Sequence, residues 1–76
     1  MLILSVAEVE PIGAAYAQAQ RIRYRQQVFE RRCSFSPHQR QQAIKACQKY
    51  LDAYPFNCLL VTDATGYTLW TYVGES

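Results

Sequence analysis

The sequence predicts an α+β domain in which two antiparallel helices pack on a C-terminal antiparallel β-hairpin. Three observations predict this class. Apolar residues recur with helical spacing through residues 12–33 and 37–54, an SFSP break separates these segments, and β-branched and aromatic residues dominate residues 56–73. The chain has 76 residues, so we expect a single small domain, 1–76.

The segment 12–33 is predicted to form the first helix because it is rich in strong helix formers. One apolar stripe follows it through Ala15, Ala19, Ile22, Phe29 and Cys33. The helix would begin near Pro11, because a proline at the first helical position loses no hydrogen bond. Residues 1–6, MLILSV, fit either a short edge strand or the lead-in to a helix, and both alternatives stay open.

The second helix is predicted to begin after the SFSP break. Ser36 would be its N-cap, Pro37 its first residue and Gln39 the partner that completes a capping box. Its apolar stripe consists of Ala43, Cys47, Tyr50 and Tyr54, widened by Ile44 and Leu51. Pro55 would end the helix, because the residue before a proline avoids helical dihedrals.

The hairpin is predicted from two apolar strands around the turn DATG. If Thr62 pairs with Tyr67, then Leu59 lies opposite Trp70. The face away from the helices would then carry Leu59, Val61, Trp70 and Tyr72. An isolated two-stranded sheet is only marginally stable, so this second face needs a cover.

The cover is predicted to be another protein, and the alternative is that MLILSV and the ends of the helices wrap this face. The chain is short for a self-sufficient core, and its three cysteines form neither an even set nor a CxxC pair. We therefore expect a homodimer, or docking on a larger protein, through the hairpin residues named above. No apolar run approaches the ~20 residues that span a bilayer, so we expect no membrane partner and a cytoplasmic protein with reduced thiols.

Catalytic and metal chemistry find little support. Cys33, His38, Cys47 and Cys58 lack the close pairing typical of zinc ligands, so we expect no metal and no cofactor. A dyad of Cys33 and His38 is imaginable across the helix break, but no third group is evident to orient it. The sequence therefore predicts a protein that is not an enzyme.

The charge distribution indicates an interaction surface. All eight lysines and arginines lie within residues 21–49, where Glu30 is the only acid. On the first helix and the start of the second, we expect a basic face made chiefly of Arg21, Arg25, Arg32 and Arg40. This basic face predicts a regulatory or adaptor protein that binds an acidic partner. The alternatives are a small nucleic-acid-binding protein that uses the same arginines, and a face that is merely solvated.

Overall fold

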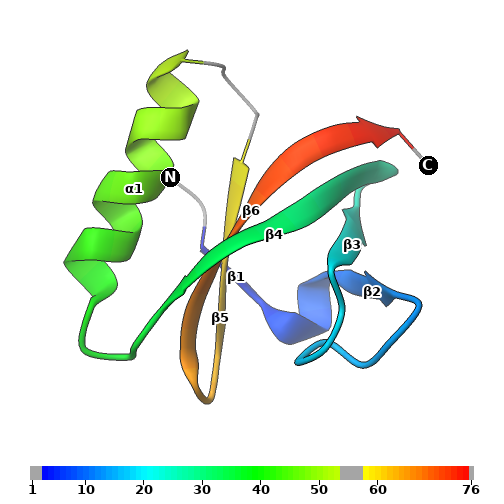
Figure 1. Cartoon of the computed structure of the whole chain (residues 1–76), viewed down its shortest axis with the longest axis horizontal. Helices are drawn as coiled ribbons and strands as arrows, with labels where there is room; N and C mark the ends of the chain where they lie inside the picture. The colour runs from blue at the N-terminus through cyan, green and yellow to red at the C-terminus, as the bar shows by residue number, and fades with distance from the viewer. Residues whose placement is uncertain (1–2, 54–57, 76) are drawn as a thin grey trace.

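The computed structural model describes residues 3–53 and 58–75 (Figure 1). In chain order its elements are β1 (Ile3–Ser5), the 3₁₀ helix η1 (Val6–Glu8), β2 (Glu10–Ile12), β3 (Arg21–Tyr24), β4 (Gln27–Phe35), α1 (Arg40–Ala53), β5 (Cys58–Asp63) and β6 (Gly66–Glu75). The six strands form one sheet in the order β1-β5-β6-β4-β3-β2. Only β1 and β5 pair in parallel, and the sheet curls into a half-barrel with α1 against one side (Figure 1).

The prediction of two helices is wrong, because the segment 12–33 contains no helix in this structure. Its second half forms β3 and β4, joined by a two-residue turn of Arg25 and Gln26. The physical reason lies in the alternation of RIRY. Ile22 is fully buried while Arg21 is exposed, which is the period-two burial of a strand with one covered face. Pairing with β6 extends from Gln27 to Phe35, with two register shifts, and supplies hydrogen-bond partners for much of the backbone of β4.

The prediction of the other helix is confirmed, with α1 beginning at Arg40 rather than Pro37. The Ser36 N–H donates to Oε1 of Gln39 at 3.0 Å, which is one half of the expected capping box. Along the expected stripe Ala43 and Cys47 are buried, and the residues that widen it pack beside them. Tyr54 lies outside the described residues.

The hairpin and its register are confirmed. Leu59 pairs with Trp70 and Thr62 with Tyr67. At the turn, Oδ1 of Asp63 accepts a hydrogen bond from the Thr65 N–H at 2.8 Å. Gly66 has a positive φ of 135°, and a Cβ at this position would collide with the carbonyl oxygen of Phe35.

The N-terminal alternative is decided in favour of a strand. Residues 3–5 form β1, which lies at the edge of the sheet and runs parallel to β5. After it, the Ser5 N–H donates to Glu8 at 2.7 Å and closes the turn of η1. The chain then crosses to the opposite edge of the sheet, where β2 pairs with β3.

The face of the sheet that α1 covers is called the outer face here. Its buried side chains form the outer cluster, which consists of Ala43, Cys47, Cys58, Leu60 and Leu69. Partly buried aromatic residues, among them Phe35, Tyr50 and Tyr67, pack against this cluster. The outer cluster therefore attaches α1 to β5, β6 and the C-terminal end of β4.

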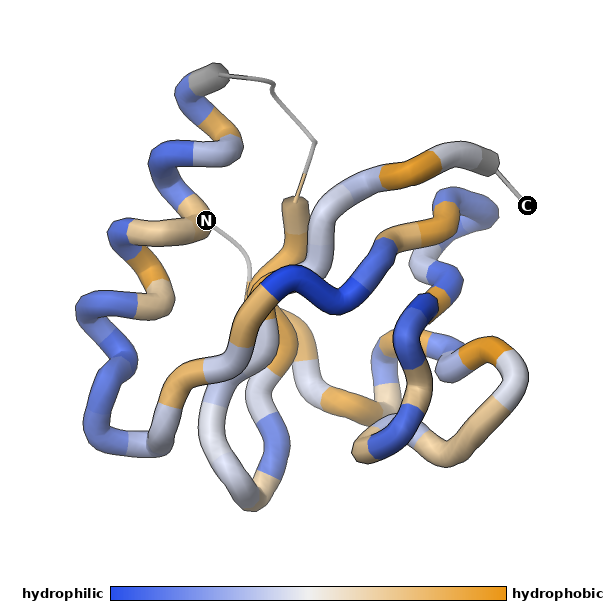
Figure 2. The backbone as a smooth tube through the Cα atoms, in the orientation of Figure 1, coloured by the Kyte–Doolittle hydropathy of each residue, from blue (hydrophilic) through white to orange (hydrophobic). Residues whose placement is uncertain are grey.

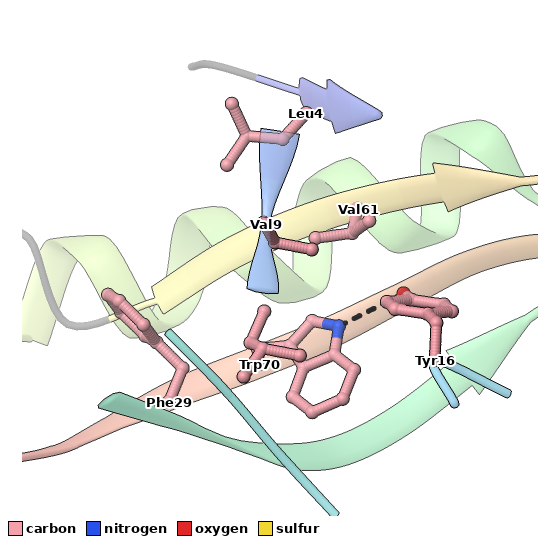
Figure 3. Packing of buried hydrophobic residues seen from close by; sticks show 7 residues of the cluster. Leu4, Val9, Tyr16, Phe29, Val61 and Trp70 are labelled. Carbon is pink, nitrogen blue, oxygen red and sulfur yellow. Dashed lines mark hydrogen bonds between the residues drawn. The ribbon is translucent and has the colours of Figure 1, made fainter. Parts of the chain in front are cut away.

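The opposite, inner face of the sheet holds the larger core. This inner cluster consists of Leu4, Val9, Tyr16, Ile22, Phe29, Val61 and Trp70 (Figure 3). Trp70 is fully buried, and its indole Nε1–H donates to the Tyr16 hydroxyl at 3.2 Å. The second face of the hairpin is therefore covered by the chain itself, through β1, β3, β4 and the segment before β3.

Over the described residues, no helix combines the length and apolar character needed to cross a bilayer.

Candidate interaction surface

One half of the outer face has no helix over it. The contacts of α1 with the sheet fall chiefly on β4, β5 and β6, and β2 and β3 lie on the far side of the molecule from α1 (Figure 1). Side chains that leave the outer face of β2, β3 and the first half of β4 are therefore free to meet solvent.

Strand alternation identifies these side chains. Ile22 and Phe29 lie opposite each other and belong to the inner cluster, so their neighbours Arg21, Arg23 and Glu30 project from the outer face. Glu10 of β2 lies opposite Arg23 and shares that face.

The charged groups on this face are ordered in alternating sign across the strands. Arg23 Nη1 lies 3.0 Å from Oε1 of Glu10, and Arg21 Nε lies 3.5 Å from Oε2 of Glu30. The Arg21 and Glu10 side chains are 60% and 66% exposed, so each pair contributes little to stability and remains accessible to a partner.

Arg32 extends the row of charges along β4. Its Nη2 donates to Oγ1 of Thr71 at 3.2 Å, and Thr71 pairs with both Glu30 and Cys58 on the outer face. We call Glu10, Arg21, Arg23, Glu30 and Arg32 together the arginine ladder. A strongly hydrophilic stretch of β4 is visible in Figure 2.

Arg31, the neighbour of Arg32, points to the other side of the sheet. Its guanidinium lies 4.6 Å from the ring centre of Trp70 and 5.5 Å from that of Tyr16. Its Nη2 donates to the Tyr16 carbonyl at 2.7 Å, and its Nε donates to the Ala19 carbonyl at 3.0 Å. Arg31 therefore holds the segment before β3 against the inner cluster and is not part of the candidate surface.

The four arginines predicted to form one basic helical face are separated by the structure. Arg21 and Arg32 both belong to the arginine ladder. Arg25 lies in the turn between β3 and β4, with its guanidinium 5.2 Å from the ring centre of Tyr24, and Arg40 is the first residue of α1. The expected helical face does not exist, because the segment that would carry most of it is a β-hairpin.

Sequence reasoning missed Arg23, Glu10 and Glu30 as members of this surface. The signal that could have found Arg23 is the alternation of arginines at positions 21, 23 and 25, which places polar residues on one face of a strand. Glu10 could not be found in this way, because its position depends on the pairing of β2 with β3.

The four residues predicted to form an assembly interface contribute to the core of the single chain. Val61 and Trp70 are fully buried, and Leu59 and Tyr72 pack against the inner cluster. Neighbouring strands also line both edges of the hairpin, since β6 pairs with β4 and residues 60–62 of β5 pair with β1. The hairpin surface expected to meet a partner is therefore turned inward, and self-association stays a prediction that must involve another surface.

The cysteines and His38 do not assemble into a metal site in the part of the chain that the structure describes. Cys33 is exposed on β4, and Cys47 and Cys58 are buried in the outer cluster. Partial burial raises the pKa of the Cys33 thiol, and the neighbouring Arg32 opposes this effect. A raised pKa is unfavourable for a nucleophilic cysteine at neutral pH.

Comparison of the chain with known protein families, with curated proteins and with solved structures finds no match. The class that the structure defines is a small α+β protein, in which one helix covers half of the outer face of a half-barrel sheet.

Proposed function

We propose that this chain is a small, non-catalytic regulatory or adaptor module that docks on an acidic protein surface through the arginine ladder. The observation that carries the proposal is the uncovered half of the outer face, where three arginines and two glutamates form an exposed and ordered array.

Arg32 is the member best placed to recognise a carboxylate. Its guanidinium has five N–H donors, and one of them is engaged by the neutral hydroxyl of Thr71. Within the described residues, no carboxylate lies at ion-pair distance from Arg32. A carboxylate from a partner could therefore bind this guanidinium in the bidentate geometry that arginine favours.

The glutamates favour a protein partner over a nucleic acid. Glu10 and Glu30 place negative charge among the arginines, and this charge repels a continuous row of phosphates. A protein surface carries both signs and can match an alternating array.

The aromatic residues support the same choice. Every aromatic side chain of the described residues belongs to the inner or the outer cluster or packs against one of them. The arginine ladder therefore has no aromatic platform on which an unpaired base could stack. Nucleic-acid binding remains the alternative outcome of the test below.

The test is an NMR titration of the ¹⁵N-labelled chain with a short peptide of alternating Glu and Ser residues, at low salt. We expect amide shifts confined to β2, β3 and the first half of β4. Arg32→Glu should weaken peptide binding about tenfold or more, because a charge-assisted hydrogen bond contributes about 1.5–3 kcal/mol.

The matched control is Arg40→Glu, which changes the net charge equally but lies at the start of α1. Equal loss of binding in both variants would mean that net charge alone attracts the peptide, and the proposal would fail. A single-stranded oligonucleotide of the same charge serves as the second ligand. If it binds the ladder more tightly than the peptide, the nucleic-acid alternative replaces the proposal.

A further inference from the structure

Two of the three cysteines meet where α1 packs on the sheet. The Sγ atoms of Cys47 in α1 and Cys58 in β5 lie 2.7 Å apart, although the residues are 11 positions apart in the chain. Both side chains are nearly inaccessible, with 1% and 5% of each residue exposed. Their surroundings are the apolar outer cluster, in which Ala43, Leu60 and Leu69 are the other buried members.

The contact is closer than the hydrophobic packing of two thiols requires. A free cysteine packs as a small apolar side chain, which explains the burial of Cys47 and Cys58 but not the direct approach of one sulfur to the other. The two elements already hold the sulfur atoms in contact, so a covalent bond between them needs no relocation of α1 or β5. A disulfide forms only where the backbone brings two cysteines together in this way.

We propose that Cys47 and Cys58 are a redox modification site, at which a peroxide converts the two thiols into a reversible disulfide that ties α1 to β5. This site is separate from the arginine ladder and does not depend on the proposed function.

The reaction balances with hydrogen peroxide as the oxidant. Because both sulfurs are buried, a local opening of α1 must first admit the peroxide. The sulfur of Cys47 then attacks one peroxide oxygen, the O–O bond breaks, and Cys47 becomes a sulfenic acid with release of one water. The sulfur of Cys58 then attacks that of Cys47, the S–O bond breaks, and a second water leaves with the proton of the Cys58 thiol. Two thiols lose two electrons and two protons in all, and an external dithiol reverses the change.

The hydrogen bonding around the pair indicates which sulfur reacts first. The Cys58 thiol can donate to the sulfur of Cys47, and this bond lowers the pKa of Cys47. The same bond, together with burial, raises the pKa of Cys58. Cys58 is also 3.4 Å from the Cys47 carbonyl oxygen, a second acceptor for its proton. Cys47 is therefore the attacking sulfur and Cys58 the resolving thiol.

The disulfide would close a loop from Cys47 to Cys58 and restrict the unfolded chain. In the chain-entropy treatment, this restriction stabilises the folded protein. For a domain of this size, the unfolding midpoint should then rise by roughly 10–20 °C. The oxidised and reduced forms should consequently differ in a simple melting experiment.

The test uses the full chain with Cys33→Ser, which removes the exposed thiol. The folded protein is treated with hydrogen peroxide, alkylated with N-ethylmaleimide and digested with trypsin without reduction. Trypsin cleaves after Arg32, Arg40, Lys45 and Lys49 and so places the cysteines in different peptides. Position 33 lies in peptide 33–40, Cys47 in peptide 46–49 and Cys58 in peptide 50–76. We expect 46–49 linked to 50–76 with the loss of two hydrogens, a raised melting midpoint, and reversal of both by dithiothreitol.

The controls are Cys47→Ser and Cys58→Ser in the same background, which should show neither the link nor the rise in midpoint. Should a serine variant fail to fold, the peptide map of the wild-type chain still decides between Cys47–Cys58 and any link to Cys33. The proposal is overturned if peptides 46–49 and 50–76 remain separately alkylated, if they carry only sulfinic acids, or if the link includes Cys33.

Discussion

Arg31 shows how one residue can connect two parts of this fold. It is a half-buried arginine whose guanidinium lies over Trp70 and Tyr16 and donates to two backbone carbonyls of the segment before β3. Its neighbour Arg32 carries the same charge but leaves the opposite face of the sheet. Two adjacent arginines therefore have different functions, one in the core and one on the candidate surface.

We predict that Arg31→Lys lowers the free energy of unfolding by about 1–3 kcal/mol. Lysine keeps the charge but cannot donate in the fixed fork geometry of arginine, so one buried carbonyl loses its partner. The measurement is urea unfolding followed by fluorescence, with Trp70 as the single tryptophan of the chain. Arg32→Lys is the matched control and should change stability by less than about 0.5 kcal/mol. Equal effects of the two variants would contradict the assigned role of Arg31.

At the scale of elements, the β3–β4 hairpin replaces the expected first helix. Its turn consists of two non-glycine residues with positive φ, 52° at Arg25 and 66° at Gln26. Both central residues of a type I′ turn have positive φ, and this turn type matches the twist of the flanking strands. Arg25 lies over the Tyr24 ring, which offsets part of the backbone strain.

We predict that Gln26→Gly raises the free energy of unfolding by about 0.5–1 kcal/mol, because glycine adopts positive φ without a Cβ penalty. The matched control is Gln42→Gly in α1, which should lower it by about 1 kcal/mol. Thermal unfolding of both variants shows whether each substitution raises or lowers the free energy of unfolding. A helix over residues 12–33 would instead make both substitutions destabilising, so the sign at position 26 separates the two folds.

At the scale of the whole molecule, the half-barrel covers the second face of the β5–β6 hairpin within one chain, whereas the sequence predicts that a partner covers it. The segment before β3 and the strands β1, β3 and β4 converge on Trp70 and Val61 from the inner face, while α1 covers part of the outer face. The pairing of β4 with β6 also occupies one edge of the hairpin, and the pairing of β1 with residues 60–62 of β5 occupies the middle of the other. The fold is therefore complete without a second copy at the hairpin.

We predict that self-association at the hairpin does not stabilise the fold, because the chain itself covers this surface. The unfolding midpoint of the reduced chain should then stay constant over about a hundredfold range of protein concentration, whereas a fold that self-association stabilises melts higher at higher concentration. Calorimetry at several concentrations, together with sedimentation velocity, makes this measurement. A midpoint that rises with concentration would show that assembly contributes to stability. In that case Val73→Asp would test its exposed side chain as a contact, since Val73 is 48% exposed.

The candidate site could be predicted from the sequence only in part. Arg21 and Arg32 were identified because basic residues are concentrated between positions 21 and 49, and composition alone reveals this. Their arrangement with Glu10 and Glu30 depends on which strands pair, and pairing between distant segments leaves no local pattern. The contact of Cys47 with Cys58 likewise requires the packing of α1 on β5.

The sequence by itself determined the elements whose signals are local. The turn residues of DATG set the register of the C-terminal hairpin, and the stripe of Ala43 and Cys47 set the buried side of α1. Only the tertiary structure decided the state of residues 12–33, whose helix formers and alternating arginines favour different structures. The C-terminal hairpin decides between them, because its inner face needs a cover and the edge of β6 needs hydrogen-bond partners. As strands, β3 and β4 bury Ile22 and Phe29 in the cluster that contains Trp70, and β4 pairs with β6. A helix could not pair with that edge.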